Sequence, residues 1–540
     1  MRCGSPVFGI VRDTAPVVRT SSGAVLGENR EGVAVFRGIP YGGDVSGENR
    51  FLPAEPAAPW EGVRDCTTNG PIAVQFGTSI SGSADFGDYF SGGHPEKFGC
   101  EKEVQGENCL VLNVLTPGLD EGKRPVVVYI HGGGFATGSG TLVLGADQWV
   151  REEDLVVVGV NHRLNVFGYL NLGAYDPAYS ASGMAGILDL VLALRWVRDN
   201  IASFGGDPEK VTIMGESGGG GKVNHLLALK EATGLFRAAI VESGSGAPST
   251  LSPEAAWLTA KGLLDKLGIP EEDWKKLLEI PAQDLLQATA DFSMSFSPSG
   301  DEEHLPYNAA GEYWEANPAL TLLVGASADE VAAFDDPEPL TWEQLRQRLV
   351  GEGEETFPEI SPGQDEKGRR NWGAKLSGRK GGLDGTPGIT PDNVDQAIAI
   401  FRELSPDADP YHILMRIRSQ CGPLGAGAYQ QEISKAAKGQ GAVYGYYVTF
   451  QAPHPRHPEQ RFAWHTADLP LQMRVVAYKS CEKVSEAMAH AWAAFIRTGS
   501  PSTPELSWPP FTLEEKKVLV FGDHPHVESD PTAPYREFNL

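Results

Sequence analysis

The sequence predicts an α/β protein in which helices cover both faces of a central, mostly parallel sheet. Short aliphatic runs without polar alternation are typical of buried strands, and they occupy residues 125–131, 155–161, 211–214 and 238–242. A helical pattern begins near Met184, between the second run and the third, and repeats its apolar residues every three to four positions. Alternation of strand and helix over this length predicts a parallel sheet, because each helix returns the chain to the same edge.

The alternation is interrupted after residue 250. Residues 251–290 have the pattern of short amphipathic helices, and residues 350–395 are rich in Gly, Glu, Lys and Pro, which predicts a surface excursion. Strand patterns return at 320–324, at 442–450 and at 517–521, where we expect the final strand. A late helix carries an apolar stripe of Val484, Met488, Trp492 and Phe495. We therefore expect one domain over residues 1–540, with helical insertions at about 250–320 and 335–440.

The composition excludes several classes of function. The 45 Lys and Arg residues against 71 Asp and Glu residues give a formal net charge of −26, which argues against binding to nucleic acid or to anionic membranes. None of the six cysteines forms a CxxC pair, so we expect no metal site and no cofactor. The chain has no Asn-X-Ser/Thr sequon and no apolar leader at its start, and we expect a cytoplasmic protein.

The segment Gly215-Glu216-Ser217-Gly218-Gly219 is the most informative part of the chain. It fits the pattern G-x-S-x-G and lies where a predicted strand changes to a helix, which is the context of a nucleophile elbow. Such a turn exposes the serine hydroxyl at a helix N-terminus, where developing negative charge is favoured. The sequence therefore predicts Ser217 as a nucleophile, with a chance Gly-Ser turn as the alternative.

A second glycine-rich segment, His131-Gly132-Gly133-Gly134-Phe135, directly follows the strand predicted at 125–131. Backbone N–H groups of such a run can bind the oxyanion of a tetrahedral intermediate, together with the N–H of the residue after the nucleophile. We therefore predict an oxyanion hole made by Gly133, Gly134 and Gly218, with Gly132 shaping the turn. A phosphate loop is disfavoured because no G-x-x-x-x-G-K-[ST] pattern is present.

In these motifs the chain resembles the type-B carboxylesterase family, whose members are α/β-hydrolases and include cholinesterases and bacterial para-nitrobenzyl esterases. The resemblance implies the α/β-hydrolase fold, with insertions around the mouth of the active site. It extends over most of the chain and is carried by VVRTSSGAVLG (17–27), FRGIPY (36–41), ENCL (107–110), HGGGF, NHRL (161–164), ALRWV (193–197), FGGDP (204–208), the elbow and ESG (242–244).

The resemblance also implies the other two members of a catalytic triad. The family's acid follows a late strand, and the segment GASADEVAAF (325–334) places it at Glu330, with Asp329 as the alternative. The family's base lies in a loop that matches residues 464–470, which places it at His465. His454 and His457 lie in a proline-rich segment that we expect to be a solvated loop. An imidazole with an ordinary pKa predicts that activity falls below roughly pH 6.

Other positions receive supporting roles from the resemblance. Glu216, Ser243 and Asp468 match a polar layer beneath the triad, and solvated surface is the alternative for them. Two structural ion pairs are expected, Arg37 with Glu107 and Arg163 with Asp189. Neither pair is assigned a role in the chemistry.

The sequence departs from the secreted relatives at one disulfide. Ala73 occupies the position of the first cysteine of that bridge, whereas Cys109 matches the second, so the bridge cannot form as in the family. Cys66 and Cys100 are possible substitutes. Residues 76–99 contain aromatic side chains (Phe76, Phe86, Tyr89, Phe90 and Phe98) but no tryptophan, which gives no support for a choline pocket.

The function predicted from these motifs is that of a serine hydrolase that cleaves small carboxylic esters through an acyl-enzyme. A lipase and an amidase or carbamate hydrolase are alternatives, because they use the same triad. A non-catalytic recognition protein of the same fold is less favoured, since all three triad residues are present.

Overall fold

The computed structural model describes residues 15–79, 87–99, 103–244, 246–248, 250–290, 296–300, 304–305, 316–351, 386 and 388–538. Everything below refers to these residues. The surface excursion predicted at 350–395, and Phe86 and Cys100, lie wholly or largely outside them.

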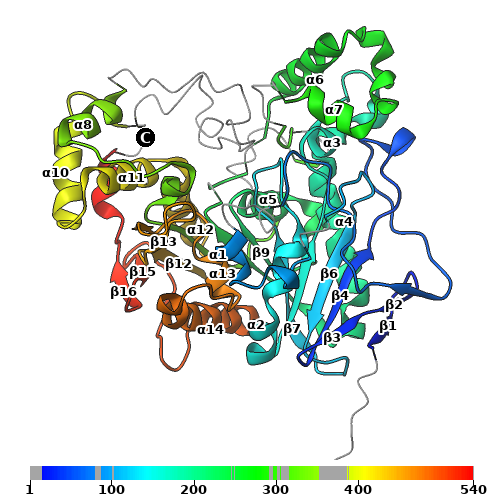
Figure 1. Cartoon of the computed structure of the whole chain (residues 1–540), viewed down its shortest axis with the longest axis horizontal. Coiled ribbons are helices and arrows are strands. Elements are labelled where there is room, and N and C mark those ends of the chain that lie inside the picture. Colours follow the sequence, from blue (N-terminus) through cyan, green and yellow to red (C-terminus); the bar gives the residue numbers. More distant parts are fainter. Residues whose placement is uncertain are drawn as a thin grey trace, which may run out of the picture.

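An eleven-stranded sheet forms the centre of the molecule (Figure 1). The strands from β8 through β7, β9, β10, β11 and β12 to β15 are parallel, and antiparallel strands complete both edges. Their order across the sheet is β16 (His526–Ser529), β15 (Lys517–Phe521), β12 (Val443–Val448), β11 (Thr321–Ser327), β10 (Ala238–Glu242), β9 (Gly206–Glu216), β7 (Arg124–Ile130), β8 (Val156–Val160), β6 (Val111–Thr116), β4 (Val33–Pro40) and β3 (Glu28–Arg30). The mostly parallel sheet predicted from the aliphatic runs is therefore confirmed.

Two smaller sheets lie outside the central one. The opening strands β1 (Val17–Arg19) and β2 (Ala24–Leu26) pair antiparallel, and β5 (Val63–Asp65) adds to β2 in parallel. Strands β13 (Ala452–Pro453) and β14 (Arg461–Phe462) form a short antiparallel pair in the segment that leads to His465.

Helices cover both faces of the central sheet. The helices α4 (Ala185–Asn200) and α5 (Gly218–Ala228) contact each other and β9, whereas α2 (Asp147–Glu153) and α14 (Glu482–Thr498) form a second group on the other face. Trp149 of α2 donates a 3.1 Å hydrogen bond to the carbonyl of Ala489 in α14. The predicted apolar stripe of the late helix is buried in this second group.

Among the residues that the structure describes, one helical stretch, Pro177–Phe204, has the length and mean hydropathy (1.3) of a membrane-spanning helix. However, 72% of its apolar window is buried inside the protein. It contains α4, whose burial against β9 accounts for its apolar character.

The helices outside these two layers form two groups at the same end of the molecule (Figure 1). One group contains α6 (Pro253–Leu267), a 3₁₀ helix (Glu271–Leu278) and α7 (Ala282–Ala288), and the other contains α8 (Trp342–Val350), α10 (Val394–Leu404) and α11 (Pro410–Gln420). Helix α12 (Pro423–Lys438) contacts β11 and β12 and therefore covers the sheet. Further short helices in the described residues are α1 (Gly87–Ser91), α3 (Asn165–Tyr169) and α13 (Leu469–Gln472).

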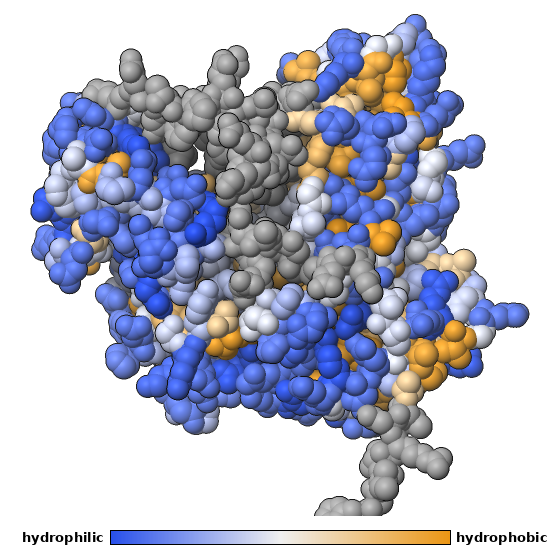
Figure 2. Space-filling view, viewed as in Figure 1, coloured by the Kyte–Doolittle hydropathy of each residue, from blue (hydrophilic) through white to orange (hydrophobic). Residues whose placement is uncertain are grey.

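The visible face of the molecule is mainly hydrophilic, and apolar residues gather over α6 and α7 (Figure 2). Trp257 and Leu258 of α6 are among the exposed large apolar side chains. A mainly hydrophilic surface is expected from the strongly acidic composition. Most large apolar side chains are buried in the core.

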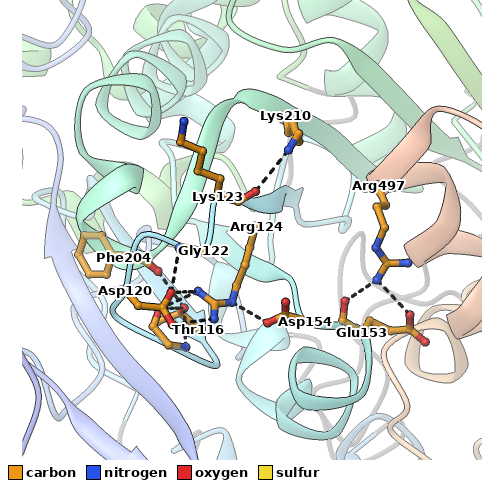
Figure 3. Close-up of polar contacts among 11 residues, drawn as sticks. Thr116, Asp120, Gly122, Lys123, Arg124, Glu153, Asp154, Phe204, Lys210 and Arg497 are labelled. Carbon is orange, nitrogen blue, oxygen red and sulfur yellow. Dashed lines mark hydrogen bonds and ion pairs between the residues drawn. The ribbon is translucent and has the colours of Figure 1, made fainter.

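The amino end of β7 is tied by exposed ion pairs (Figure 3). Arg124, the first residue of the strand, contacts Asp120 at 2.5 Å and Asp154 at 2.6 Å. Nearby, Lys210 donates to the carbonyl of Lys123, and Arg497 donates to the carbonyl of Glu153 at 2.6 Å. These contacts join β7 and the loop before it to Asp154, directly after α2, and to β9, and they join the last residue of α2 to α14.

Two expectations about the fold were wrong. The strand at 517–521 is not the last one, because β16 follows it and pairs with it.

The second wrong expectation concerns the ion pair of Arg37 with Glu107. Arg37 contacts Glu28 at 2.7 Å, across the β3–β4 pair, while Glu107 accepts two hydrogen bonds from Arg50, at 2.6 and 2.8 Å. The planar guanidinium of Arg50 satisfies both carboxylate oxygens at once. The other expected pair is confirmed: Arg163 contacts Asp189 at 2.7 Å, and both side chains are buried.

Candidate active site

Ser217 stands at a sharp turn between β9 and α5. Its backbone angles (φ 57°, ψ −124°) are strained for a residue other than glycine, and its N–H donates to the carbonyl of Glu242 at 2.8 Å. A Cβ atom on Gly215 would lie 2.4 Å from the carbonyl carbon of Gly219, so only glycine fits before the turn. The turn leaves Ser217 partly exposed at the N-terminus of α5.

The glycine loop, which we define as residues 131–135, follows the carboxyl end of β7 and lies against this turn. Gly133 (φ 82°) and Gly134 (φ 61°) both adopt left-handed conformations. Their N–H groups donate to no acceptor among the described residues. A Cβ atom on Gly218 would lie 2.2 Å from the carbonyl oxygen of Gly134, so the loop and the elbow are in direct contact.

Glu330 lies just beyond β11 and is fully buried. One carboxylate oxygen accepts hydrogen bonds from the Ser243 hydroxyl and from the Ser327 N–H, each at 2.6 Å. The other oxygen contacts Nδ1 of His465. The carboxylate is therefore fixed from one side and presented to the imidazole from the other.

The second ring nitrogen of His465 faces a different carboxylate. Nε2 lies 3.3 Å from Oε1 of Glu216, and among the described residues no hydrogen bond joins His465 to the Ser217 hydroxyl. In proteins without bound substrate, catalytic hydrogen bonds are often long or poorly aligned and tighten only in the complex. The imidazole is thus oriented by Glu330 and lies beside the elbow.

These carboxylates change the expected acid–base behaviour of His465. Burial alone lowers the pKa of His465, but the nearby charges of Glu216 and Glu330 outweigh burial and raise the pKa to about 9. A protonated imidazole cannot act as a base. The loss of activity expected below pH 6 therefore moves to higher pH.

The neighbouring acid, Asp329, has other partners. Its carboxylate contacts Arg416 at 2.5 Å and accepts the N–H of Ala463 at 3.0 Å, and its own N–H donates to the carbonyl of Ala463. Asp329 thus ties the loop that carries His465 to α11. Of the two acids left open by the sequence, Glu330 is the one whose carboxylate contacts His465.

His454 does not lie in a solvated loop. It is buried, its Nε2 lies 3.0 Å from the carbonyl of Ala332, and its ring packs edge-on against Phe462. The expectation of solvation was wrong for this residue because the β13–β14 pair folds its segment back onto the protein. His457 is half-buried and lies 3.3 Å from Asp336.

A layer of buried polar groups underlies the triad. Glu216, Ser243 and Asp468 are all buried, so they do not form solvated surface. Burial, together with the nearby acids, raises the pKa of Glu216 to about 8, and burial raises that of Asp468 to about 6. Tyr446 donates to Asp468 at 3.4 Å.

Sequence reasoning missed one acidic member of this layer. Glu242, at the end of β10, accepts a 2.6 Å hydrogen bond from the indole of Trp492. Burial raises the pKa of Glu242 well above its usual value. The position of Glu242 at the carboxyl end of a predicted parallel strand was the available signal, because functional groups of α/β sheets gather at that edge.

Ala73 and Cys109, the two positions of the family disulfide that cannot form here, lie beside the same small cavity. Cys109 is a buried free thiol, and burial raises its pKa to about 12. Ala73 and Cys109 both line a cavity of about 10 Å³, which Arg163 and Phe167 also line. Cys66 is likewise a buried free thiol.

The aromatic residues between these cysteine positions are mostly buried. Tyr89, Phe90 and Phe98 belong to the core, and the Tyr89 hydroxyl donates to the carbonyl of Ala467 at 2.6 Å. Tyr89 and Trp464 also stack edge-on, with ring centroids 4.9 Å apart. Tyr89 therefore supports the loop that carries His465.

No group of three or more His, Cys, Asp or Glu side chains suited to a metal ion occurs within the part of the chain that the structure describes. The chemistry supported by the described side chains is that of a serine, an imidazole and a carboxylate beside free backbone N–H groups.

Comparison with known proteins agrees with this geometry. The model of the carboxylesterase family matches residues 14–373 and 422–538. The para-nitrobenzyl esterase of Bacillus subtilis (strain 168) is 30% identical over 97% of this chain and 98% of its own length, and the phenmedipham hydrolase of Pseudarthrobacter oxydans is 29% identical over 94% and 96%. A crystal structure of a Geobacillus stearothermophilus carboxylesterase superposes with a TM-score of 0.73 at 32% identity, covering 97% of this chain and all of that chain.

Proposed function

Because the chain belongs to the carboxylesterase family, we propose that Ser217, His465 and Glu330 are the catalytic triad with which it hydrolyses small carboxylic esters. The α/β-hydrolase fold and the activity of a carboxylic ester hydrolase follow from the family and its named esterases, which do not favour the lipase and amidase alternatives. The observation that best supports these residue roles is the contact of the buried Glu330 carboxylate with Nδ1 of His465, beside the strained turn at Ser217.

In the proposed mechanism, His465 accepts the proton of Ser217 while the serine oxygen attacks the ester carbonyl. Glu330 holds the imidazole in the tautomer that presents Nε2 as the base and stabilises the imidazolium that forms. The protonated imidazole then gives its proton to the leaving alcohol. Water repeats these steps on the acyl-enzyme and releases the acid.

The oxyanion of each tetrahedral intermediate is proposed to bind to the N–H groups of Gly133, Gly134 and Gly218. Two of these groups have no acceptor in the described structure, and the third begins α5. Donors that are already oriented need no reorganisation when negative charge develops. Gly132 shapes the turn before them, because a side chain there would meet the backbone of Glu216.

The substitution Ser217→Ala tests the proposed triad. We expect the rate of p-nitrophenyl acetate hydrolysis to fall at least roughly 10,000-fold while the fold survives, and a fluorophosphonate probe to label the wild type only. Ser252→Ala is the matched control, since Ser252 caps α6 and lies outside the proposed site. Substantial residual turnover in the purified Ser217→Ala protein would refute the assignment.

The acyl preference is tested by p-nitrophenyl esters of increasing chain length. An esterase of small substrates is expected to prefer short acyl chains. A strong preference for chains beyond about ten carbons would instead indicate a lipase, whose substrate is an aggregated lipid surface.

We also propose that the protein acts in the cytoplasm and binds neither nucleic acid nor membranes. The net charge of −26 and the buried free thiols of Cys66, Cys109, Cys421 and Cys481 support this proposal. Peptide mapping without reductant tests it. A disulfide in the native protein, for example one that includes Cys100, would indicate an oxidising compartment.

A further inference from the structure

Lys222 is a fully buried lysine in the wall of the candidate active site. It is the fifth residue of α5, so it follows the nucleophile by little more than one helical turn. A cation near a helix N-terminus faces the positive end of the helix dipole, and burial of its charge is unfavourable. Its position therefore requires specific compensating contacts.

Within the described part of the chain, the hydrogen bonds of the Lys222 side chain are with the glycine loop. The side-chain nitrogen donates to the carbonyl oxygen of His131 at 3.0 Å and to that of Gly134 at 2.7 Å. The same nitrogen lies 5.4 Å from the centre of the Phe135 ring. One side chain thus binds the loop on both sides of the glycines whose N–H groups are free.

The Gly134 carbonyl also contacts the nucleophile elbow. An added Cβ atom on Gly218 would lie 2.2 Å from the Gly134 oxygen and 2.4 Å from the Gly134 Cα. The loop therefore fills the space that a side chain at 218 would need. Lys222 and Gly218 therefore act on the same carbonyl group, that of Gly134. Lys222 donates a hydrogen bond to it, and the missing side chain of Gly218 leaves room for it.

The charged and titratable groups around Lys222 favour this arrangement. Glu216 is the nearby acid and partly offsets burial, which lowers the pKa of Lys222 to about 7. His131 and His162 stack with ring centroids 4.6 Å apart, and burial lowers the pKa of both, so they add no positive charge at neutral pH. An amine and an ammonium both carry at least two N–H donors, so either form of Lys222 can bind the two carbonyls.

We propose that Lys222 is a positioning residue of the ester hydrolase: it holds the glycine loop against Gly218 and thereby fixes the N–H groups that bind the oxyanion. This inference rests on the proposed function, because it assigns Lys222 a role only if the loop binds an oxyanion. Lys222 contacts the loop, so it is proposed to act on the reaction through backbone geometry. Its effect is expected in the transition state more than in substrate binding.

The substitution Lys222→Met tests the proposal, with p-nitrophenyl acetate as substrate and a trifluoromethyl ketone as an analogue of the tetrahedral intermediate. We expect kcat to fall roughly 10- to 100-fold, which is at most the lower limit of about 100-fold for the loss of one oxyanion donor, because the donors are displaced and not removed. KM should change little. The affinity for the ketone should fall by a similar factor. A folded variant whose kcat and ketone affinity both stay within about twofold of wild type would overturn the inference.

Lys435→Met is the matched control. Lys435 is also buried and donates to a backbone carbonyl, that of Pro318 at 2.7 Å, but it lies in α12. This control removes the same kind of charge, so we expect lower thermal stability with kcat unchanged. A fall in kcat equal to that of Lys222→Met would show that any buried lysine has this effect, and would refute a specific role in positioning.

Gly218→Ala keeps the proposal testable if Lys222→Met does not fold. Its added methyl group would displace the Gly134 carbonyl from the other side, so kcat and ketone affinity should again fall together. Unchanged values would overturn the inference. Ser217→Ala, measured in parallel, separates the two hypotheses: turnover that survives Ser217→Ala refutes the proposed triad, whereas its loss beside an unaffected Lys222→Met refutes only the role of Lys222.

Discussion

At the amino end of β7, Arg124 binds two acids that are largely exposed to water, whereas at the carboxyl end of the same strand the charged groups around the glycine loop are buried. Asp120 and Asp154 are 62% and 69% exposed, but Glu216 and Lys222 are inaccessible to solvent. Water screens the exposed charges, so each of their ion pairs contributes little to stability. The buried groups lose their hydration and depend on hydrogen bonds and charges that the fold supplies, so removal of one partner should have a large effect.

Among the buried charged groups at the carboxyl edge of the sheet, substitution of Glu330, just beyond β11, should have the largest effect on kcat. Glu330→Gln keeps the shape of the side chain but presents the wrong group to His465, and we expect kcat to fall roughly 1,000- to 10,000-fold. Asp329→Asn is the matched control, because Asp329 contacts Arg416 and Ala463. Asp329→Asn should lower the melting temperature, and it should lower kcat much less than Glu330→Gln does. A greater loss of kcat in Asp329→Asn would reverse the assignment of the acid.

The buried ion pair of Arg163 and Asp189 should show the largest effect on stability. Arg163→Met leaves Asp189 buried without its partner, and breaking such a pair typically destabilises a protein by about 3–5 kcal/mol. Urea unfolding followed by fluorescence measures this change, and the folded fraction should keep its kcat. A loss below about 1 kcal/mol would mean that water reaches the pair.

A smaller effect is expected on the pH dependence of kcat/KM. The rate should fall as the pH drops through the pKa of His465, because only neutral imidazole accepts the proton of Ser217, and that pKa is raised above its usual value. Glu216→Gln removes one of the charges that stabilise the imidazolium, so the acidic limb should move to lower pH. Glu61→Gln, a substitution at an exposed position, is the control. An acidic limb of the kcat/KM profile at the same pH in Glu216→Gln and in wild type would show that Glu216 does not raise the pKa of His465.

The smallest effect is expected at the amino end of β7. Asp154→Asn removes one of the two acids that contact Arg124, but Asp120 remains as a partner. Exposed pairs of this kind contribute little to stability, and salt screens them. We expect no measurable change in the urea midpoint or in kcat. A clear loss of stability would contradict the contrast between the two ends of the strand.

The sequence predicted the parts of the molecule that depend on local patterns. The aliphatic runs gave the parallel strands, and the turn from strand to helix placed Ser217. Short polar segments such as β16 (HVES) lack a pattern that distinguishes a strand from a loop. Its pairing with β15 arises from the edge that the sheet offers, which is a tertiary effect.

Side-chain partners were harder to predict, since they depend on segments far apart in the chain. A lysine at position 222 looks like a solvated helix residue until the carbonyls of His131 and Gly134 are placed beside it. Arg37 and Glu107 have suitable charges, yet Arg50 is the residue that donates to both carboxylate oxygens of Glu107. The roles of Asp329 and Tyr89 in supporting the His465 loop also required the folded structure.

The strand order has a consequence for biosynthesis. Ser217 follows β9, whereas His465 follows β12, and the chain must add β10 and β11 before β12 can pair. Under the proposed roles, a nascent chain that has been translated only as far as the serine elbow lacks His465 as its base. We therefore expect esterase activity only after the segment that follows β12 has been translated.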